Sequence, residues 1–330
     1  MVFHWLGPTC QTHYPPGFDS QNMANDIPSA IAVMGPTAVG KSAVAEHLAR
    51  ALGCRIVNAD AFQVYRGLDI GTNKPGAAEM YALLDILEPW ESFSLGQFVE
   101  LAEGIVANEF ASGRNIIVAG GTGLYVRALF EGYTEIAGKP DPDLRAKLVE
   151  EYHDLGPEAF AKSYGIGPET VPRSTILNSR HFVRLVERRL VPAIHRSRPQ
   201  FNARFLKFGL ELDKRELDER INARVVSMVQ NGWLEEVSAL RARGASKDWP
   251  GMRAIGYCLL LDCLNEEISL DKAIEGIQAQ TRRYAKRQMT WLRREPNVHW
   301  LDANKAPAEL TEEILSVVQL KQGGCDGKGD

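Results

Sequence analysis

Apolar residues in the first part of the chain are grouped in short runs, each followed closely by a glycine or an acidic residue. Four such runs lie at residues 31–34, 55–57, 83–87 and 115–119. Short apolar runs bounded in this way are typical of buried parallel strands. Segments with a helical spacing of apolar residues lie between them, at 42–52 and 98–110. Strands that alternate with helices predict an α/β fold, in which helices cover both faces of a mostly parallel sheet.

The pattern changes after Asp141. No further strand is predicted until 297–301, and residues 141–195 favour short helices separated by glycine and proline. Helices resume near Leu217. We therefore expect five segments, which are a disordered lead at 1–28, an α/β core at 29–140, a helical insertion at 141–200, a helical C-terminal part that returns to the core at 201–322, and a disordered tail at 323–330.

The longest helix is expected at 271–294. Six of its residues repeat at alternating spacings of three and four, and they are Ile274, Ile277, Thr281, Tyr284, Gln288 and Trp291. Residues so spaced share one face of a helix. A stripe of this kind usually packs into a core, so we predict a buried face here.

Composition excludes several classes of protein. The 330 residues are 45% hydrophobic and 24% charged, as in ordinary globular proteins of about two domains. The five cysteines are odd in number and lack the paired spacing of a zinc site or a disulfide framework. No apolar run approaches the ~20 residues that span a bilayer, and the N-terminus does not resemble a secretory signal. We expect a cytoplasmic protein that starts at Met1 or at Met23.

One glycine-rich segment carries a recognisable chemistry. The stretch Gly35-Pro36-Thr37-Ala38-Val39-Gly40-Lys41-Ser42 matches the phosphate-loop pattern G-x-x-x-x-G-K-[ST], between an expected strand and an expected helix. Its backbone N–H groups can surround a phosphate at the positive end of the helix dipole. Lys41 would add a positive charge, and Ser42 would bind Mg²⁺. The pattern predicts a phosphorylated ligand, but nucleoside triphosphates such as ATP and compounds with a diphosphate group are equally compatible with it.

Five further segments, taken together with this loop, indicate the family that the sequence resembles. They are NADAFQVYRGLDIGTNKP at 58–75, LDI at 84–86, GGTGLY at 120–125, RAIGY at 253–257 and AKRQMTWLR at 285–293. Their identity and order resemble the tRNA dimethylallyltransferase (tRNA isopentenyltransferase) family over about residues 30–302. The resemblance implies a core similar to P-loop nucleoside kinases. It also implies a monomeric enzyme that transfers dimethylallyl from dimethylallyl diphosphate to the exocyclic amine of the adenosine 3′ of the anticodon in tRNA.

The resemblance also implies roles for individual residues. Asp60 would accept the proton of the adenine amine, Thr122 would orient the reacting groups, and Lys41 would act on the diphosphate leaving group. Arg224 is a further candidate for binding the same diphosphate. The residues implied in contact with the tRNA anticodon loop are Asp60, Ala61, Phe62, Gln63, Arg180, His181, Arg184, Arg253, Gly256, Tyr257, Arg282, Arg283, Lys286 and Arg287. Three residues depart from the family pattern, and they are Tyr81, Ser179 and Cys258.

Local charge is consistent with an RNA substrate although the net charge of the chain is −4. Residues 173–207 hold nine Lys or Arg and one acid, and residues 282–294 hold six and no acid. Such contacts would position RNA through its phosphates, and the target base would have to leave its stack. A solvated helix face is the alternative explanation of both runs.

Other interpretations remain open at this point. Asp60 could instead be a ligand of Mg²⁺, and Thr122 could be the N-cap of the following helix. The competing functions are dimethylallyl transfer to a free adenylate, a small-molecule P-loop kinase, and a nucleotide-dependent RNA-binding switch.

Overall fold

The computed structural model describes residues 27–132, 135–137, 142–167, 169–191, 193–195 and 200–320. The chain divides into two compact units. The larger combines the residues up to Phe130 with those from Phe201 onward, and the smaller is Glu131–Gln200. The expected disordered tail, most of the disordered lead, and both candidate start residues lie outside the described residues.

The larger unit is built on a six-stranded sheet with the order β3-β2-β4-β1-β7-β8, in which every pairing is parallel. The strands are β1 (Ser29–Met34), β2 (Arg55–Asn58), β3 (Tyr81–Ala82), β4 (Ile116–Ala119), β7 (Arg204–Glu211) and β8 (Val298–Asp302). All six residues of β1 are buried, as its apolar sequence requires for a central parallel strand. The predicted α/β fold is confirmed.

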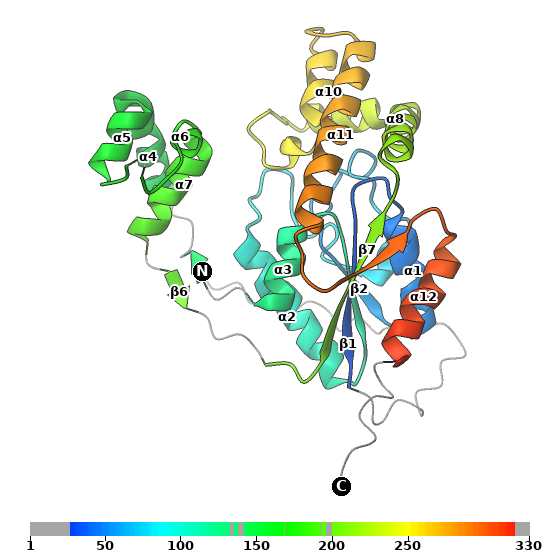
Figure 1. Ribbon diagram of the computed structural model, residues 1–330. Helices are drawn as coiled ribbons and strands as arrows, with labels where there is room; N and C mark the ends of the chain where they lie inside the picture. The colour runs from blue at the N-terminus through cyan, green and yellow to red at the C-terminus, as the bar shows by residue number, and fades with distance from the viewer. Residues whose placement is uncertain are drawn as a thin grey trace. The chain divides into compact units, whose positions relative to one another are not determined.

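Helices cover both faces of this sheet. Figure 1 shows α2 and α3 on one side of the strands and α1 and α12 on the other. The helices of the larger unit are α1 (Lys41–Leu52), α2 (Leu95–Ala111), α3 (Gly123–Glu131), α8 (Lys214–Gln230), α9 (Trp233–Ala242), α10 (Tyr257–Leu264), α11 (Leu270–Leu292) and α12 (Pro307–Leu320), with the short 3₁₀ turns η2 (Ala78–Met80) and η3 (Gly251–Arg253). No helix in the described part of the chain is long and apolar enough to cross a membrane.

The strand expected at 83–87 is only two residues long and lies earlier, at Tyr81–Ala82. Leu83 and Asp85 adopt φ values of 66° and 51°, and such values turn the chain out of an extended path. Beyond them Leu87 forms only an isolated bridge with Tyr65. A strand does lie near the apolar run, but the local backbone conformation ends it before Leu83.

A central strand was missed between 141 and 297. β7 pairs with β1 on one side and with β8 on the other. Its sequence, RFLKFGLE, contains Lys207 in the middle, and this charge hides the apolar run that would predict a strand. Yet Lys207 is buried, because Glu295 accepts a hydrogen bond from its Nζ at 3.2 Å.

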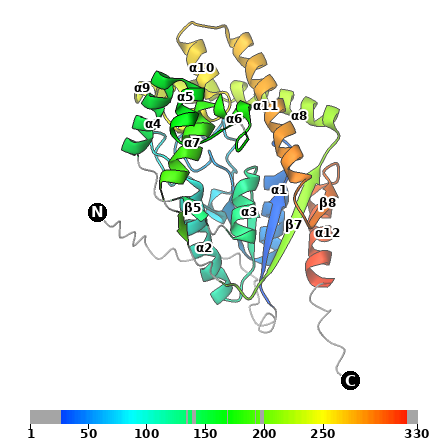
Figure 2. The ribbon, with the colours of Figure 1, turned by 60° about the vertical axis from the view of Figure 1, so that its left-hand side comes forward.

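The smaller unit is mainly helical. Its elements are β5 (Glu135–Ala137), α4 (Pro142–Leu155), α5 (Pro157–Ser163), α6 (Arg173–Ile176), α7 (Ser179–Leu190) and β6 (Ala193–His195). The helices enclose a core of their own that includes Tyr152, Phe160 and Phe182, and Figure 2 shows α4, α5, α6 and α7 grouped together. The antiparallel β5–β6 pair was not predicted from the sequence.

Glu295, just after α11, joins three elements of the larger unit. Its side chain is fully enclosed, and it accepts hydrogen bonds from Lys207 of β7 and from Nε of Arg127 of α3, the latter at 2.7 Å. A buried carboxylate is tolerated only when cations and hydrogen bonds compensate for its lost hydration. This cluster therefore fixes the end of α11 against the sheet.

We expect Glu295→Ala to lower the free energy of unfolding by about 3 kcal/mol or more. Without the carboxylate, nothing compensates its cationic partners for the hydration that they lose on burial. Glu313→Ala is the matched control, since Glu313 faces Lys305 at the surface and such pairs contribute at most about 1 kcal/mol. Denaturant unfolding of both variants measures the difference. Equal losses would contradict the assigned role of Glu295.

Candidate active site

The ends of three neighbouring strands bring together the segments that the sequence singled out. β4 pairs with both β1 and β2, so the segments after these strands leave the same edge of the sheet. They are the phosphate loop after β1, the Asp60 segment after β2 and the Gly120–Gly123 segment after β4. Ligands bind at this carboxyl edge in open parallel sheets.

The phosphate loop has the backbone that its glycines permit. Gly40, immediately before α1, has a φ of 104°, a conformation that residues with a Cβ rarely adopt. A Cβ on Gly35 would lie 2.8 Å from Cγ1 of Val39 and 3.0 Å from the Leu210 carbonyl oxygen. Lys41 begins α1 and donates from Nζ to the Pro36 carbonyl at 2.7 Å. The amino end of the helix and the Lys41 charge therefore face the same loop.

A second cation reaches the loop from α8. Nη2 of Arg224 donates to Oγ1 of Thr37, so the residue implied by the family resemblance does lie beside the phosphate loop. Nε of Arg224 is buried and has no hydrogen-bond partner within the described residues. An unsatisfied guanidinium N–H is costly, and an anion held by the loop would remove that cost.

The two cations destabilise each other. Burial, followed by the charge of Arg224, lowers the pKa of Lys41 to about 8, and Asp60 opposes this change. Burial likewise lowers the pKa of Arg224 to about 10. Desolvation and like charge both disfavour a protonated amine. The site is therefore arranged to bind an anion.

Asp60 lies at the end of β2 and is half-buried. Its Oδ1 accepts hydrogen bonds from the amides of Phe62 at 2.9 Å and Gln63 at 3.4 Å. Burial raises the pKa of this carboxyl, although the two amides and the charges of Lys41 and Arg224 act in the opposite direction. A carboxylate with a raised pKa is a better proton acceptor than an exposed one.

Thr122 holds the Asp60 segment in place. Its Oγ1 accepts from the amide of Ala61 at 3.2 Å, and its own amide donates to the Ala59 carbonyl at 3.1 Å. The hydroxyl thus bonds a neighbouring loop, and the N-cap alternative does not account for that bond. Thr122 and Asp60 belong to one hydrogen-bonded unit.

The glycines around Thr122 are required by close approach. A Cβ on Gly120 would lie 2.1 Å from the Ala59 carbonyl oxygen, and one on Gly123 would lie 2.0 Å from the Trp291 ring. These distances are far below van der Waals contact, so no side chain fits at either position. The motif therefore records how tightly three segments pack.

The sequence analysis missed Gln288 as a site residue. Its Oε1 accepts from the amide of Thr37 at 2.8 Å, and its Nε2 donates to the Gly121 carbonyl at 2.8 Å. One side chain of α11 thereby joins the phosphate loop to the segment after β4. The available signal was a glutamine on a helix face that the spacing predicts to be buried, because a buried amide needs partners.

Comparison with known proteins agrees with this geometry. Family models described as IPP transferase and isopentenyl transferase match residues 63–295 and 28–87. A tRNA dimethylallyltransferase of Thermomicrobium roseum is 39% identical over 286 residues, covering 83% of this chain and 86% of that protein. One from Anaeromyxobacter dehalogenans is 42% identical over 301 residues, covering 86% and 96%.

The chain belongs to the tRNA dimethylallyltransferase family. The resemblance inferred from five short segments is thus confirmed, and with it the class of enzyme, a prenyltransferase. A solved tRNA isopentenylpyrophosphate transferase of Bacillus halodurans has a TM-score of 0.67 at 33% identity, covering 89% of this chain and 96% of its own.

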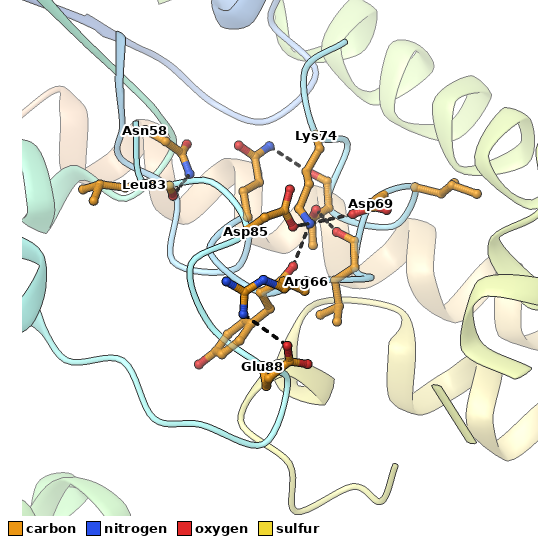
Figure 3. Close-up of polar contacts among 12 residues, drawn as sticks. Asn58, Arg66, Asp69, Lys74, Leu83, Asp85 and Glu88 are labelled. Carbon is orange, nitrogen blue, oxygen red and sulfur yellow. Dashed lines mark hydrogen bonds and ion pairs between the residues drawn. The ribbon is translucent and has the colours of Figure 1, made fainter. Parts of the chain in front are cut away.

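Much of the segment most specific to the dimethylallyltransferase family is structural. Nζ of Lys74 donates to the Tyr65 carbonyl and to Asp69, both at 2.6 Å, and also pairs with Asp85, as Figure 3 shows. Glu236 of α9 accepts from the amides of Asp69 and Ile70, each at 2.7 Å. The segment after Asp60 is therefore fixed in place by its own Lys74 and by Glu236 of α9.

Two of the residues implied in tRNA contact are enclosed within the larger unit. Gly256 and Tyr257 are buried, and the Tyr257 hydroxyl donates to Glu236 at 2.7 Å. A Cβ on Gly256 would lie 2.3 Å from the Trp233 ring. These residues hold α9 and α10 together, and their implied contact with RNA stays a prediction.

The remaining implied contacts differ in exposure. Arg253, Arg283, Lys286 and Arg287 are exposed, and Ala61, Phe62 and Gln63 are half-buried. Arg282 is half-buried and bonds Asn222 of α8, so it also joins helices. In the smaller unit Arg180 and His181 are exposed, whereas Arg184 pairs with Glu187 at 2.7 Å.

The three departures from the family pattern have ordinary contacts. Tyr81 donates from its hydroxyl to Glu46 at 3.3 Å, and Sγ of Cys258 contacts the Met252 carbonyl at 3.1 Å. Ser179 is the first residue of α7, directly after the Asn178 cap.

We expect Gln288→Met to weaken binding of inorganic diphosphate roughly tenfold, which is about 1.4 kcal/mol. The variant keeps length and packing but removes the acceptor of the Thr37 amide, so the phosphate loop loses its fixed position. The free energy of unfolding should also fall by about 1–3 kcal/mol, because the Thr37 amide is left without an acceptor. Gln280→Met, on the same helix, is the control in calorimetric titration. Equal affinities in the two variants would show that the Gln288 bonds do not position the loop.

Proposed function

We propose that the chain transfers the dimethylallyl group from dimethylallyl diphosphate to the exocyclic amine of the adenosine 3′ of the anticodon in tRNA, releasing diphosphate. The observation that carries the proposal is the convergence of Asp60 with Lys41 and Arg224 at the phosphate loop. These three residues would supply a proton acceptor and a site for the leaving group within one cluster of charged side chains.

The leaving group is stabilised by the phosphate loop. As the bond between C1 of the allyl group and the diphosphate oxygen breaks, the electron pair passes to that oxygen. Lys41, Arg224 and the loop amides face the developing negative charge. Electrostatic stabilisation by fixed groups of this kind is commonly the largest contribution to a rate, and the unfavourable charge of the two cations is relieved in the same step.

The nucleophile needs a proton acceptor because an aromatic amine is weakly basic. As the adenine nitrogen bonds to C1, its proton passes to Asp60. Burial raises the pKa of Asp60, which favours the protonated product of that transfer. Thr122 keeps the Asp60 segment in position through the Ala61 amide. A base held within hydrogen-bond reach contributes about 10²- to 10⁴-fold.

The residues present fit a magnesium ion shared with the diphosphate. The Ser42 hydroxyl lies in the first turn of α1, next to Lys41, and Mg²⁺ prefers such oxygen ligands together with phosphate and water. The described residues contain no group of three or more His, Cys, Asp or Glu that could enclose a metal. When bound, the ion would supply positive charge to the leaving group.

The RNA would be held by exposed cations. Arg283, Lys286 and Arg287 line α11, whose Gln288 reaches the phosphate loop. The target base must be extruded to reach Asp60. Since tRNA is the substrate, we propose a monomeric enzyme of the cytoplasm.

The function is tested by nucleoside mass spectrometry of tRNA incubated with the protein, Mg²⁺ and dimethylallyl diphosphate. We expect dimethylallyl-adenosine in tRNA and none in free adenylate.

Asp60→Asn should lower turnover by about 10²- to 10⁴-fold and leave binding of dimethylallyl diphosphate nearly unchanged, because the amide keeps the shape but cannot accept the proton.

A magnesium titration decides between the two roles of Asp60. If Asp60 were a metal ligand, excess Mg²⁺ would restore much of the activity of Asp60→Asn. A rate that stays low at all Mg²⁺ concentrations supports the base.

The pH dependence follows from Lys41. Its lowered pKa of about 8 means that the protonated form is complete only below this pH and is lost as the pH rises through it. kcat/KM for dimethylallyl diphosphate, which reports the free enzyme, should therefore decline above about pH 8. Lys41→Arg stays protonated and should lose this decline, whatever its absolute rate. A wild-type profile that stays flat to pH 10 would contradict the assignment.

A further inference from the structure

Two tryptophans and an arginine form an aromatic cluster away from the catalytic groups. The rings of Trp90 and Trp249 meet edge to face with centroids 5.1 Å apart, and the Arg243 guanidinium lies 5.4 Å from the Trp90 centroid. Trp90 is 48% exposed. An exposed aromatic ring offers a surface on which an unpaired base can stack. We name Trp90, Trp249 and Arg243 the tryptophan platform.

The platform is rigid. It joins two distant segments, since the amide of Gly251 donates to the Pro89 carbonyl at 2.8 Å, and a Cβ on Gly251 would lie 3.1 Å from that oxygen. Glu88 accepts from Arg243 at 2.8 Å and from Arg66 at 3.1 Å. A surface fixed in this way loses little entropy on binding.

The platform is continuous with the segment that follows Asp60. The amide of Arg66 donates to the Leu87 carbonyl at 2.8 Å, and Tyr65 bridges to Leu87. Figure 3 shows Arg66 beside Glu88. Arg253 is close enough to Tyr65 to lower its pKa, although burial of the phenol prevails and raises it. Backbone hydrogen bonds therefore join the platform to the segment that carries Asp60.

The charges around the platform suit a polyanion. Arg66, Arg243 and Arg253 present three guanidinium groups. Glu88 is shared by two of these arginines, and the neighbouring Glu91 accepts from the Glu88 amide at 2.6 Å. Guanidinium groups beside an exposed ring are the combination that binds unpaired nucleotides, the ring by stacking and the cations through phosphate.

We propose that the tryptophan platform stacks an unpaired base of the tRNA substrate, with Arg243 and Arg253 contacting the adjoining phosphates. The proposal rests on the proposed function, because it takes the same RNA as the ligand. It adds a binding subsite for a nucleotide other than the modified adenosine. The free face of Trp90 supplies the stacking energy, and it reads no particular base.

The test measures equilibrium affinity for an anticodon stem-loop RNA by fluorescence anisotropy, without dimethylallyl diphosphate. Base stacking on an aromatic ring contributes about 1–3 kcal/mol, so Trp90→Leu should bind RNA roughly 5- to 150-fold more weakly. Trp90→Phe keeps an aromatic face and should retain most of the affinity. Trp300→Leu is the matched control, because Trp300 is 38% exposed on β8, outside the platform. Quenching of protein fluorescence by RNA should diminish in Trp90→Leu and persist in Trp300→Leu.

The outcomes separate the platform from the proposed function. Equal RNA affinity of wild type and Trp90→Leu overturns the platform, and so does an affinity loss shared by Trp300→Leu. A Trp90→Leu variant with altered sedimentation but unchanged RNA affinity also overturns it, in favour of a protein contact. If wild type binds RNA in a Trp90-dependent manner but prenylates none, the platform stands and the proposed function fails. The melting temperature and the KM for dimethylallyl diphosphate should be unchanged in all variants. If the melting temperature of Trp90→Leu falls, the test rests on Trp90→Phe and Arg243→Gln instead. In that case, unimpaired RNA affinity of Arg243→Gln overturns the platform.

Discussion

The backbone contact between Ala59 and Gly120 sets the geometry of the site. Where β2 and β4 end, the Ala59 carbonyl approaches Gly120 so closely that no side chain could stand there. This approach lets the amide of Thr122 reach the Ala59 carbonyl and its hydroxyl reach Ala61. Asp60 lies between these two bonded residues, so the backbone fixes its position together with the hydrogen bonds that its own Oδ1 accepts from the Phe62 and Gln63 amides. A proton acceptor held in this way needs no rearrangement when the substrate arrives.

Gln288 extends the same constraint to the phosphate loop. Because its amide group bonds Thr37 on one side and Gly121 on the other, the leaving-group site and the base are fixed to a single helix. Glu295 anchors the end of that helix to β7 and α3. The exposed face of α11 carries Arg283, Lys286 and Arg287. One rigid element thus connects a basic surface with both catalytic groups.

The sequence predicts the parts of this arrangement that depend on local patterns. β1, β2 and β4 follow from short apolar runs, and the phosphate loop and the Asp60 and Thr122 segments follow from motifs placed at strand ends. What failed depends on distant partners. β7 was hidden because Lys207 looks like a surface residue unless Glu295 is known to face it. Gln288 looked like a core residue for the same reason, since its partners lie 251 and 167 positions away in the chain.

The family motifs also mislead in one respect, because they do not distinguish residues that touch a substrate from residues that hold those in place. Lys74, Glu236 and Tyr257 belong to a buried network that supports the segment after Asp60. Lys41 and Arg224 belong to the opposite case. Both are partly desolvated cations whose pKa values are lowered, so the folded protein bears an electrostatic cost at the phosphate loop. The phosphate loop cannot move to relieve that cost, because Gln288 holds it through the Thr37 amide. In the proposed reaction a diphosphate would relieve it instead, and the repulsion between the two cations would become part of the free energy that favours leaving-group charge.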